Sequence, residues 1–165
     1  MTYRLEPLTQ DDSVREFECG EPSLDRWLID HALTARGQGT KTYLLRAPNG
    51  EVAGYAAISP HAASRHELTA KLARGAPQLI PGYLIAKLAI AEEEQGAGLG
   101  AELLLAVLTQ IIAAARSVGG RLVFVDALND KAEAFYEALS FIPCGRGRLV
   151  MKLSTAARQL GLDWP

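Results

Sequence analysis

The stretch Gln95-Gly96-Ala97-Gly98-Leu99-Gly100 decides the fold of this chain. It follows an apolar run over residues 83–90, which is interrupted only by Lys87, and it leads into a wide apolar stripe that ends near Gly119. The first run predicts a central strand, and the stripe predicts a long helix packed against a sheet. Closely spaced glycines before a helix let backbone N–H groups converge, so the turn predicts an anion site suited to phosphate.

Three other interpretations of the glycine turn can be weighed in the sequence. A plain strand-to-helix turn also uses glycines for tight geometry, and the turn alone leaves that alternative open. A nucleotide-hydrolase phosphate loop needs Gly-Lys-Ser/Thr, and Ala101-Glu102 in that place excludes it. The dinucleotide pattern matches formally at Gly96, Gly98 and Ala101, but Asp126 lies further downstream than the expected gap of about 20 residues. We keep the dinucleotide site as a distant alternative.

Strands and helices alternate on both sides of this turn, and no repeat is present. The pattern predicts an α/β (α+β) fold with a mixed, mostly antiparallel sheet flanked by helices, in a single domain over residues 1–165. Residues 60–82 are basic and rich in turn signals, and we expect them to form an exposed excursion with a short helix over 67–74. The other expected strands are 4–7, 40–46, 52–59, 121–127, 141–143 and 149–153, and the other expected helices are 22–37 and 130–139.

The charge, apolar content, cysteines and histidines of the sequence exclude several classes of function. The net charge of −2 and a pI near 5.9 argue against a wholly basic nucleic-acid binder but permit a local basic face. No apolar run reaches the roughly 18 residues of a spanning helix, and the first residues lack a signal core, so we expect a cytoplasmic protein without membrane contact. Two distant cysteines and three scattered histidines predict no metal site. We expect His31 to be packed on the first helix and His61 to lie on a solvated loop.

Two blocks of the sequence resemble one family. Gln95-x-x-Gly98-x-Gly100 resembles the [RQ]-x-x-G-x-[GA] pyrophosphate loop of the GNAT acetyltransferases. Downstream, Asn129 and the segment Ala134-Phe135-Tyr136-Glu137 followed by Phe141 resemble the second block of that family. There are two departures: Ala97 stands where a basic residue is usual, and Ser140 stands where glycine is usual. The resemblance implies a single GNAT domain that uses acetyl-CoA.

The resemblance also implies roles for individual residues. Tyr136 would be the catalytic residue, and with a pKa near its ordinary value of about 10 its hydroxyl can protonate the departing thiolate. Tyr136 as a mere core aromatic is the competing interpretation, which the upstream glycine block disfavours. No general base is evident. The residues implied to bind the cofactor are Leu88, Ala89, Ile90, Gln95, Gly96, Ala97, Gly98, Leu99, Gly100, Asn129 and Phe135.

A narrower resemblance points to a substrate. The run Phe17-x-Cys19-Gly20-x-Pro22-x-Leu24-Asp25-x-Trp27-Leu28 resembles the N-terminal motif of GNAT-type toxins from bacterial toxin–antitoxin modules, and so does the run from Pro77–Pro81 into Lys87-Leu88-Ala89-Ile90. This implies acetylation of the α-amino group of aminoacyl-tRNA, which blocks translation. It also implies a small DNA-binding antitoxin, often of ribbon-helix-helix type. The residues that could form a basic rim for RNA phosphates are Lys71, Arg74, Lys87, Arg146 and Arg148.

Two further functions stay open. The acidic balance favours an ordinary small-molecule or peptide N-acetyltransferase without a toxin role. Ala97 and Ser140 would instead suit a non-catalytic, cofactor-binding regulatory module. The tail over 156–165, with Leu160, Leu162 and Trp164, can dock on the core of the chain or on a partner, and the sequence leaves both open. A homodimer would supply such a partner.

Overall fold

The structure is a computed structural model and describes residues 2–165. Across these residues seven strands form one mixed sheet in the order β1-β2-β3-β4-β5-β7-β6. The pairing of β4 with β5 is parallel, and the pairings within β1-β2-β3 and within β5-β7-β6 are antiparallel. The expected mixed, mostly antiparallel sheet with flanking helices is therefore confirmed.

The chain divides into two compact units. Unit 1 contains the residues up to Ser59 together with Ala86–Val107, and unit 2 contains Pro60–Ile85 together with Leu108–Pro165. Each unit has its own apolar cluster, centred on Tyr55 in unit 1 and on Phe124 in unit 2. One domain over residues 1–165 stays a prediction.

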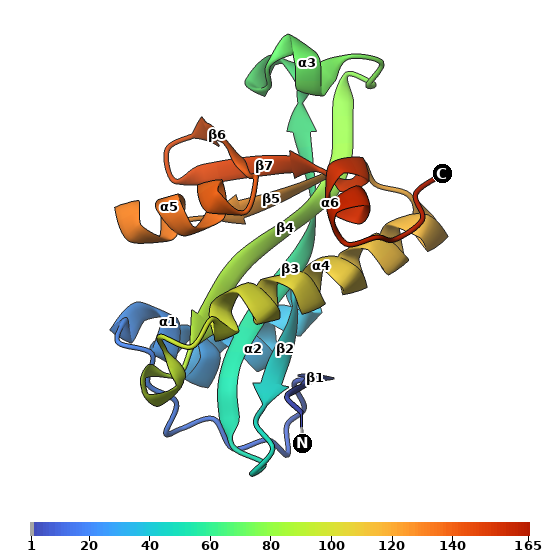
Figure 1. Cartoon of the computed structure of the whole chain (residues 1–165). Coiled ribbons are helices and arrows are strands. Elements are labelled where there is room, and N and C mark those ends of the chain that lie inside the picture. Colours follow the sequence, from blue (N-terminus) through green and yellow to red (C-terminus); the bar gives the residue numbers. More distant parts are fainter. Residues whose placement is uncertain (1) are drawn as a thin grey trace. The chain divides into compact units, whose positions relative to one another are not determined.

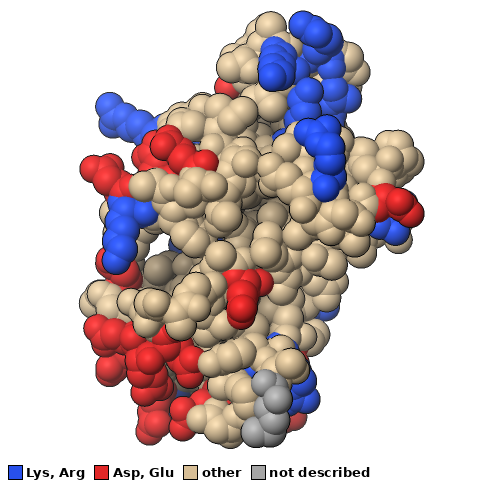
Figure 2. Space-filling model, viewed as in Figure 1, with Lys and Arg blue, Asp and Glu red and all other residues tan. Residues whose placement is uncertain are grey.

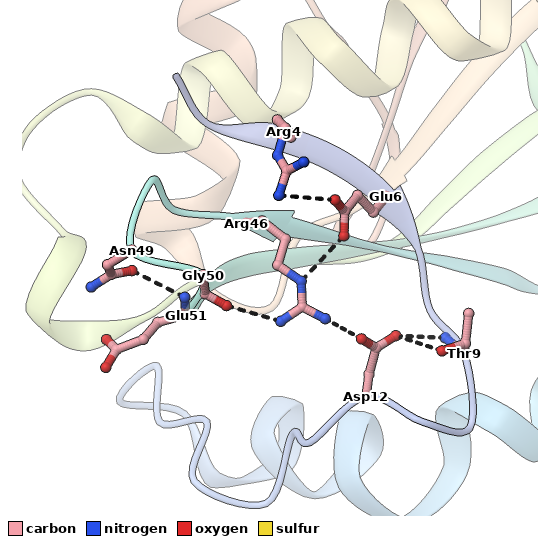
Figure 3. A network of polar contacts seen from close by, with 8 residues as sticks. All are labelled: Arg4, Glu6, Thr9, Asp12, Arg46, Asn49, Gly50 and Glu51. Atoms are coloured by element: carbon pink, nitrogen blue, oxygen red, sulfur yellow. Dashed lines mark hydrogen bonds and ion pairs between the residues drawn. The ribbon is translucent and has the colours of Figure 1, made fainter. Parts of the chain in front are cut away.

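In unit 1 a hairpin forms where the sequence predicts it. β1 (Arg4–Pro7), β2 (Lys41–Arg46) and β3 (Val52–Ser64) lie side by side (Figure 1). Arg46 fastens the hairpin end, because its guanidinium donates to the carbonyl oxygen of Gly50 at 3.1 Å and pairs with Glu6 at 3.2 Å and with Asp12 (Figure 3). Asn49 Oδ1 accepts from the backbone N–H of Glu51 at 3.0 Å, which closes the turn.

The first helical segment differs from the continuous helix expected over 22–37. A π-helical turn interrupts it, and Gly39, with a φ of 96°, ends it. A π-turn adds a residue to the turn and so rotates every later side chain about the helix axis. His31, at the end of that turn, is exposed, so the expectation that it packs in the core is wrong. The pieces are α1 (Pro22–Arg26), η1 (Trp27–His31), α2 (Ala32–Ala35) and η2 (Arg36–Gln38).

In unit 2 the parallel pairing depends on one glycine. Gly82 on β4 (Leu79–Ile90) faces Leu122 on β5 (Leu122–Asp126), and a Cβ on Gly82 would lie 2.2 Å from the carbonyl oxygen of Leu122. The two backbones can approach this closely only because Gly82 has no side chain. β7 (Arg148–Lys152) and β6 (Ile142–Gly145) extend the sheet beyond β5.

The exposed excursion expected over residues 60–82 is shorter than predicted. β3 continues to Ser64 and β4 already begins at Leu79. Pro60 and Pro81 are both exposed, at strand positions where a missing N–H is tolerated. His61 therefore lies on β3, half-buried, with its ring 4.9 Å from that of Phe124, and the expected solvated loop position is wrong. Between the strands lie η3 (Arg65–Glu67) and α3 (Ala70–Ala73).

The remaining helices are η4 (Glu92–Glu94), α4 (Leu99–Val118), α5 (Asp130–Ala138) and α6 (Leu153–Gln159), of which α6 replaces the end of the strand expected over 149–153. By length and composition alone, α4 is the one helix among residues 2–165 that could cross a membrane. Its Leu103, Leu104, Val107 and Ile112 are fully buried in the fold, which is typical of the core helix of a globular protein.

Candidate functional site

The glycine turn of unit 1 has the backbone shape of an anion site. Gly96 and Gly98 have φ angles of 90° and 80°, and nothing lies within 4 Å of a Cβ built on either. Glycine is therefore required by the backbone conformation and not by crowding. The residues from Gln95 to Gly98 are exposed and lead directly into α4. The N–H of Gln95 donates to the carbonyl oxygen of Glu92 at 3.3 Å, so the N–H groups that follow it and the positive end of the helix are open to a ligand. Ala97 adds no charge, so phosphates would depend on these backbone groups.

The side chain of Gln95 braces the turn from inside. Its amide nitrogen donates to the carbonyl oxygens of Ile90 at 2.8 Å and of Cys19 at 2.7 Å. The N–H of Cys19 in turn donates to Asp25 Oδ1 at 2.9 Å. The N-terminal motif is thus tied to the glycine turn through the carbonyl oxygen of Cys19, while the N–H of Cys19 holds Asp25 within the motif. No local pattern in the sequence predicts this brace, because the contact between Cys19 and Gln95 spans 76 residues.

The thiol of Cys19 is not a nucleophile. Its side chain is buried, and Sγ donates to the carbonyl oxygen of Glu21 at 3.6 Å. Burial, reinforced by the neighbouring Asp25, raises the pKa of Cys19 to about 12. The protonated thiol is held as part of the brace.

The strand segment before the turn lies beside an aromatic pair. Ala89 and Ile90 are buried, and Lys87 is half-buried with Nζ 5.8 Å from the ring centre of Trp27. Trp27 stacks on Tyr55 with an angle of 6° between the rings and 6.0 Å between their centres. Lys87 therefore belongs to an aromatic cluster in unit 1, whereas the other residues of the predicted basic rim lie in unit 2.

Tyr136 is buried on α5 of unit 2. It is 3% exposed and packs edge-to-face against Phe135 at 5.2 Å and Phe141 at 5.6 Å. Burial, together with the carboxylate of Asp126, raises the pKa of Tyr136 above its ordinary value of 10, so the expectation of an unshifted tyrosine is wrong. The hydroxyl keeps its proton at neutral pH and can act only as a donor of it.

The helix that carries Tyr136 is fixed at both ends. Asn129 Oδ1 accepts from the N–H of Ala132 at 2.9 Å and caps α5. At the other end Ser140 has a φ of 77°, and the N–H of Phe141 donates to the carbonyl oxygen of Tyr136 at 3.1 Å. The backbone thus adopts the left-handed conformation that suits glycine, although a serine stands there. The Ser140 departure changes the residue but keeps the turn.

The predicted basic residues of unit 2 have different surroundings. Lys71, Arg74 and Arg146 are exposed, and Lys and Arg gather over α3 (Figure 2). Arg148 instead binds the carboxylate of Asp126 with two hydrogen bonds of 2.8 and 3.1 Å, and its third nitrogen lies 3.1 Å from Nε2 of His61. Its charge is already neutralised, which makes Arg148 a poor phosphate ligand.

His61 stays neutral in this cluster. Burial and the neighbouring Arg148 both lower the pKa of His61.

Within residues 2–165, no group of three or more His, Cys, Asp or Glu side chains could hold a metal ion.

Charge is distributed unevenly between the units. Unit 1 carries seven Lys and Arg against thirteen Asp and Glu, a net charge of −6, and unit 2 carries ten against six, a net charge of +4. The chain as a whole has an acidic pI although one of its units is basic. The pI is therefore no argument against an RNA substrate.

The comparison with known families decides between the interpretations of the glycine turn. The model of the acetyltransferase (GNAT) family matches residues 7–141, a range that includes the turn and Tyr136. This chain belongs to the GNAT acetyltransferase family. The GNAT resemblance and the expected enzyme class are confirmed, and the dinucleotide alternative loses its support.

Similar proteins include a toxin that acetylates tRNA and structures of the toxin AtaT. This GNAT chain is 34% identical over 134 residues, 81% of each chain, to a tRNA-acetylating toxin of Mycobacterium tuberculosis (strain ATCC 25618 / H37Rv). Among solved structures it is similar to AtaT complexed with acetyl-methionyl-tRNAfMet, with a TM-score of 0.86 and 28% identity over 96% of this chain and 99% of that one. It is also similar to a mutant of the AtaT toxin bound to the C-terminus of the antitoxin AtaR and acetyl-CoA, with a TM-score of 0.83 and 27% identity over 98% and 99%.

Proposed function

We propose that this chain is a toxin that transfers the acetyl group of acetyl-CoA to the α-amino group of aminoacyl-tRNA in the cytoplasm and thereby blocks translation. The observation that carries the proposal is the 34% identity to a tRNA-acetylating toxin over 81% of both chains. The net charge of +4 on unit 2 supports an RNA substrate, since phosphate contacts dominate nucleic-acid affinity.

The cofactor fits the residues of unit 1. The backbone from Gln95 through Gly96, Ala97 and Gly98 to Leu99 and Gly100, which is exposed as far as Gly98, would hold the pyrophosphate. The backbone of Leu88, Ala89 and Ile90 would pair with the pantetheine arm. Acetyl-CoA supplies the thioester that is cleaved. The Gln95 brace keeps the turn in its ligand-binding shape before the cofactor arrives, which reduces the entropy cost of binding.

Tyr136 would supply a proton to the sulfur that leaves. Its high pKa keeps the hydroxyl protonated, Asn129 caps α5, and Phe135 packs against the ring of Tyr136. Asn129 and Phe135 would also contact the cofactor. An α-amino group has a pKa near 8 and is partly neutral at pH 7, so water can take its proton. His61 does not serve as a base in this scheme because Arg148 occupies its Nε2.

We also propose a small DNA-binding antitoxin, of ribbon-helix-helix type, as the partner of this chain. The support comes from similar structures: AtaT bound with the antitoxin AtaR and DNA, and the KacTA–DNA complex. A homodimer stays a prediction. The apolar tail gives less reason to expect a homodimer, because Leu160, Leu162 and Trp164 are already half-buried on the chain itself.

The test is acetyl transfer from labelled acetyl-CoA to a mixed pool of aminoacyl-tRNAs. We expect label on tRNA that is lost on deacylation, and we expect Tyr136→Phe to slow the transfer by roughly 10²- to 10⁴-fold while leaving acetyl-CoA binding intact. Tyr43→Phe, which removes a hydroxyl from β2, is the matched control and should keep full activity. Label on peptides or small amines alone would establish the alternative acetyltransferase, and acetyl-CoA binding without any transfer would establish the regulatory module.

A further inference from the structure

Unit 2 contains a second hollow that the proposed chemistry does not use. Its volume is about 370 Å³, and it is lined by Pro81, Gly120, Arg121, Lys152, Ser154 and Trp164, among others. Two cationic side chains, a hydroxyl and an indole thus surround one small cavity. No local pattern in the sequence predicts this hollow, because its lining residues come from four separate parts of the chain.

Arg121 is held rigidly at the wall of this hollow. Its backbone N–H donates to the carbonyl oxygen of Pro81 at 2.8 Å, and its own carbonyl oxygen accepts from the N–H of Leu153 at 3.0 Å. One guanidinium nitrogen donates to the carbonyl oxygen of Arg74 at 2.5 Å. The Nε of Arg121, however, is buried and has no hydrogen-bond partner within residues 2–165. No Asp or Glu is among the residues lining the hollow, so no carboxylate there pairs with the guanidinium.

The segment before Trp164 is held by hydrogen bonds as well. Arg116 donates to the carbonyl oxygen of Asp163 at 3.2 Å, and the N–H of Leu162 donates to the carbonyl oxygen of Ala157 at 2.8 Å. These bonds hold the segment that presents Trp164. The indole of Trp164 offers a flat face on which a nucleic-acid base can stack.

The surroundings favour nucleic acid as the occupant. The carbonyl bond to Arg74 joins the hollow to the residues 60–82, where Lys71 and Arg74 are exposed. Lys and Arg continue from α3 down the same side of unit 2 (Figure 2). An acidic peptide would need only the charges, whereas a nucleotide uses the charges and the indole together.

We infer that this hollow binds one nucleotide of the tRNA substrate, with its phosphate on Arg121 and Lys152 and its base against Trp164. The inference rests on the proposed function and adds a second RNA contact to it. It also gives the exposed cations of unit 2 a common role, since a phosphate backbone that enters the hollow runs past Lys71 and Arg74.

The experiment measures binding of uncharged tRNA by fluorescence anisotropy over a series of salt concentrations. Lys152→Gln should weaken binding several-fold and reduce the slope of log K against log salt by about 1, because one phosphate contact is lost. Trp164→Leu should weaken binding with little change in slope, because stacking releases no counterion. Lys41→Gln removes the same charge from β2 in unit 1 and is the control. In acetyl transfer, both hollow variants should raise the KM for aminoacyl-tRNA and leave kcat and the Kd for CoA unchanged.

The outcomes separate this inference from the proposed function. If the wild-type chain acetylates tRNA and both folded variants bind tRNA as wild type does, the hollow is not an RNA site and the proposed function stands. If the variants weaken binding of an acidic antitoxin segment but not of tRNA, the occupant is a protein and the inference is wrong. If the wild type neither binds nor acetylates tRNA, both proposals fall together. Unfolding midpoints of the two variants show whether each is folded.

Discussion

The side chain of Tyr136 is buried, and its hydroxyl would give up a proton in the reaction. Burial therefore decides the pH range over which Tyr136 can act as an acid. Because burial raises the pKa of Tyr136, the protonated form persists above pH 10. The neutral substrate amine forms as pH rises through about 8. We therefore predict that kcat/KM rises to a plateau near pH 9 and stays level to pH 10. A fall in rate between pH 8 and 9 in an initial-rate profile would contradict Tyr136 as the acid.

Ser140 carries a conformational cost that can be measured. A non-glycine residue in the left-handed region costs about 1–2 kcal/mol, and part of the gain from relieving it is offset because glycine makes the unfolded chain more flexible. With a φ of 77° at this position, Ser140→Gly should raise the free energy of unfolding by roughly 0.5–1 kcal/mol. Urea unfolding measures this. Ser117→Gly, in the last turn of α4, is the opposite control and should destabilise the protein.

At the scale of elements, the Gln95 brace connects the N-terminal motif to cofactor affinity. Gln95→Ala removes the bonds to Cys19 and Ile90, each worth about 0.5–1.5 kcal/mol. We predict that the Kd for acetyl-CoA rises roughly 10-fold, and that kcat at saturating cofactor changes little. Calorimetry gives the Kd, with Gln159→Ala on α6 as the control. An unchanged Kd would show that the turn keeps its shape without the brace.

The close approach of β4 and β5 at Gly82 predicts that a side chain at this position destabilises the protein. Gly82→Ala places a methyl group 2.2 Å from the carbonyl oxygen of Leu122, so the strands must separate, and we expect a loss of at least about 3 kcal/mol in the free energy of unfolding. Gly37→Ala meets nothing within 4 Å in a helical segment and should be neutral or slightly stabilising. Thermal unfolding of both variants, compared directly, is the measurement. Equal stabilities would show that the parallel pair tolerates separation.

The same elements show how far the sequence predicts this fold. The strand before Gln95, the helix after it and the hairpin at Gly50 follow from local patterns, and the structure contains all three. The extra lengths of β3 and β4 were missed because Pro60 and Pro81 are typical strand breakers, and only their exposure explains why strands continue through them. The spacing of apolar residues does not reveal the π-turn at Trp27–His31. Because the turn rotates the side chains about the helix axis, the spacing predicted the wrong side of the helix for His31.

The candidate site was predictable only where it lies in one segment. The glycine turn and Tyr136 belong to contiguous motifs and were predicted by resemblance. The brace between Cys19 and Gln95, the neutralisation of Arg148 by Asp126 and the hollow at Arg121 all depend on contacts between distant segments. Charge counts suggested Arg148 as a phosphate ligand because a count does not reveal an ion pair.

At the scale of the whole molecule, the uneven charge predicts a salt dependence. If Lys71, Arg74, Arg121 and Lys152 each neutralise one phosphate, log K for tRNA should fall against log salt with a slope of about −3. Binding of acetyl-CoA by neutral backbone amides should change far less over the same range. Parallel titrations of tRNA and CoA between low and physiological salt check this. Equal slopes for the two ligands would exclude tRNA as the preferred partner.

The same distribution also affects how the protein behaves on a column. A chain with a pI near 5.9 is ordinarily loaded on an anion exchanger at neutral pH and passes through heparin. Here the +4 charge belongs to one compact unit, while the excess of carboxylates belongs to the other. The sulfate groups of heparin bind clustered Lys and Arg side chains. Heparin should therefore retain this chain at pH 7 despite its overall negative charge.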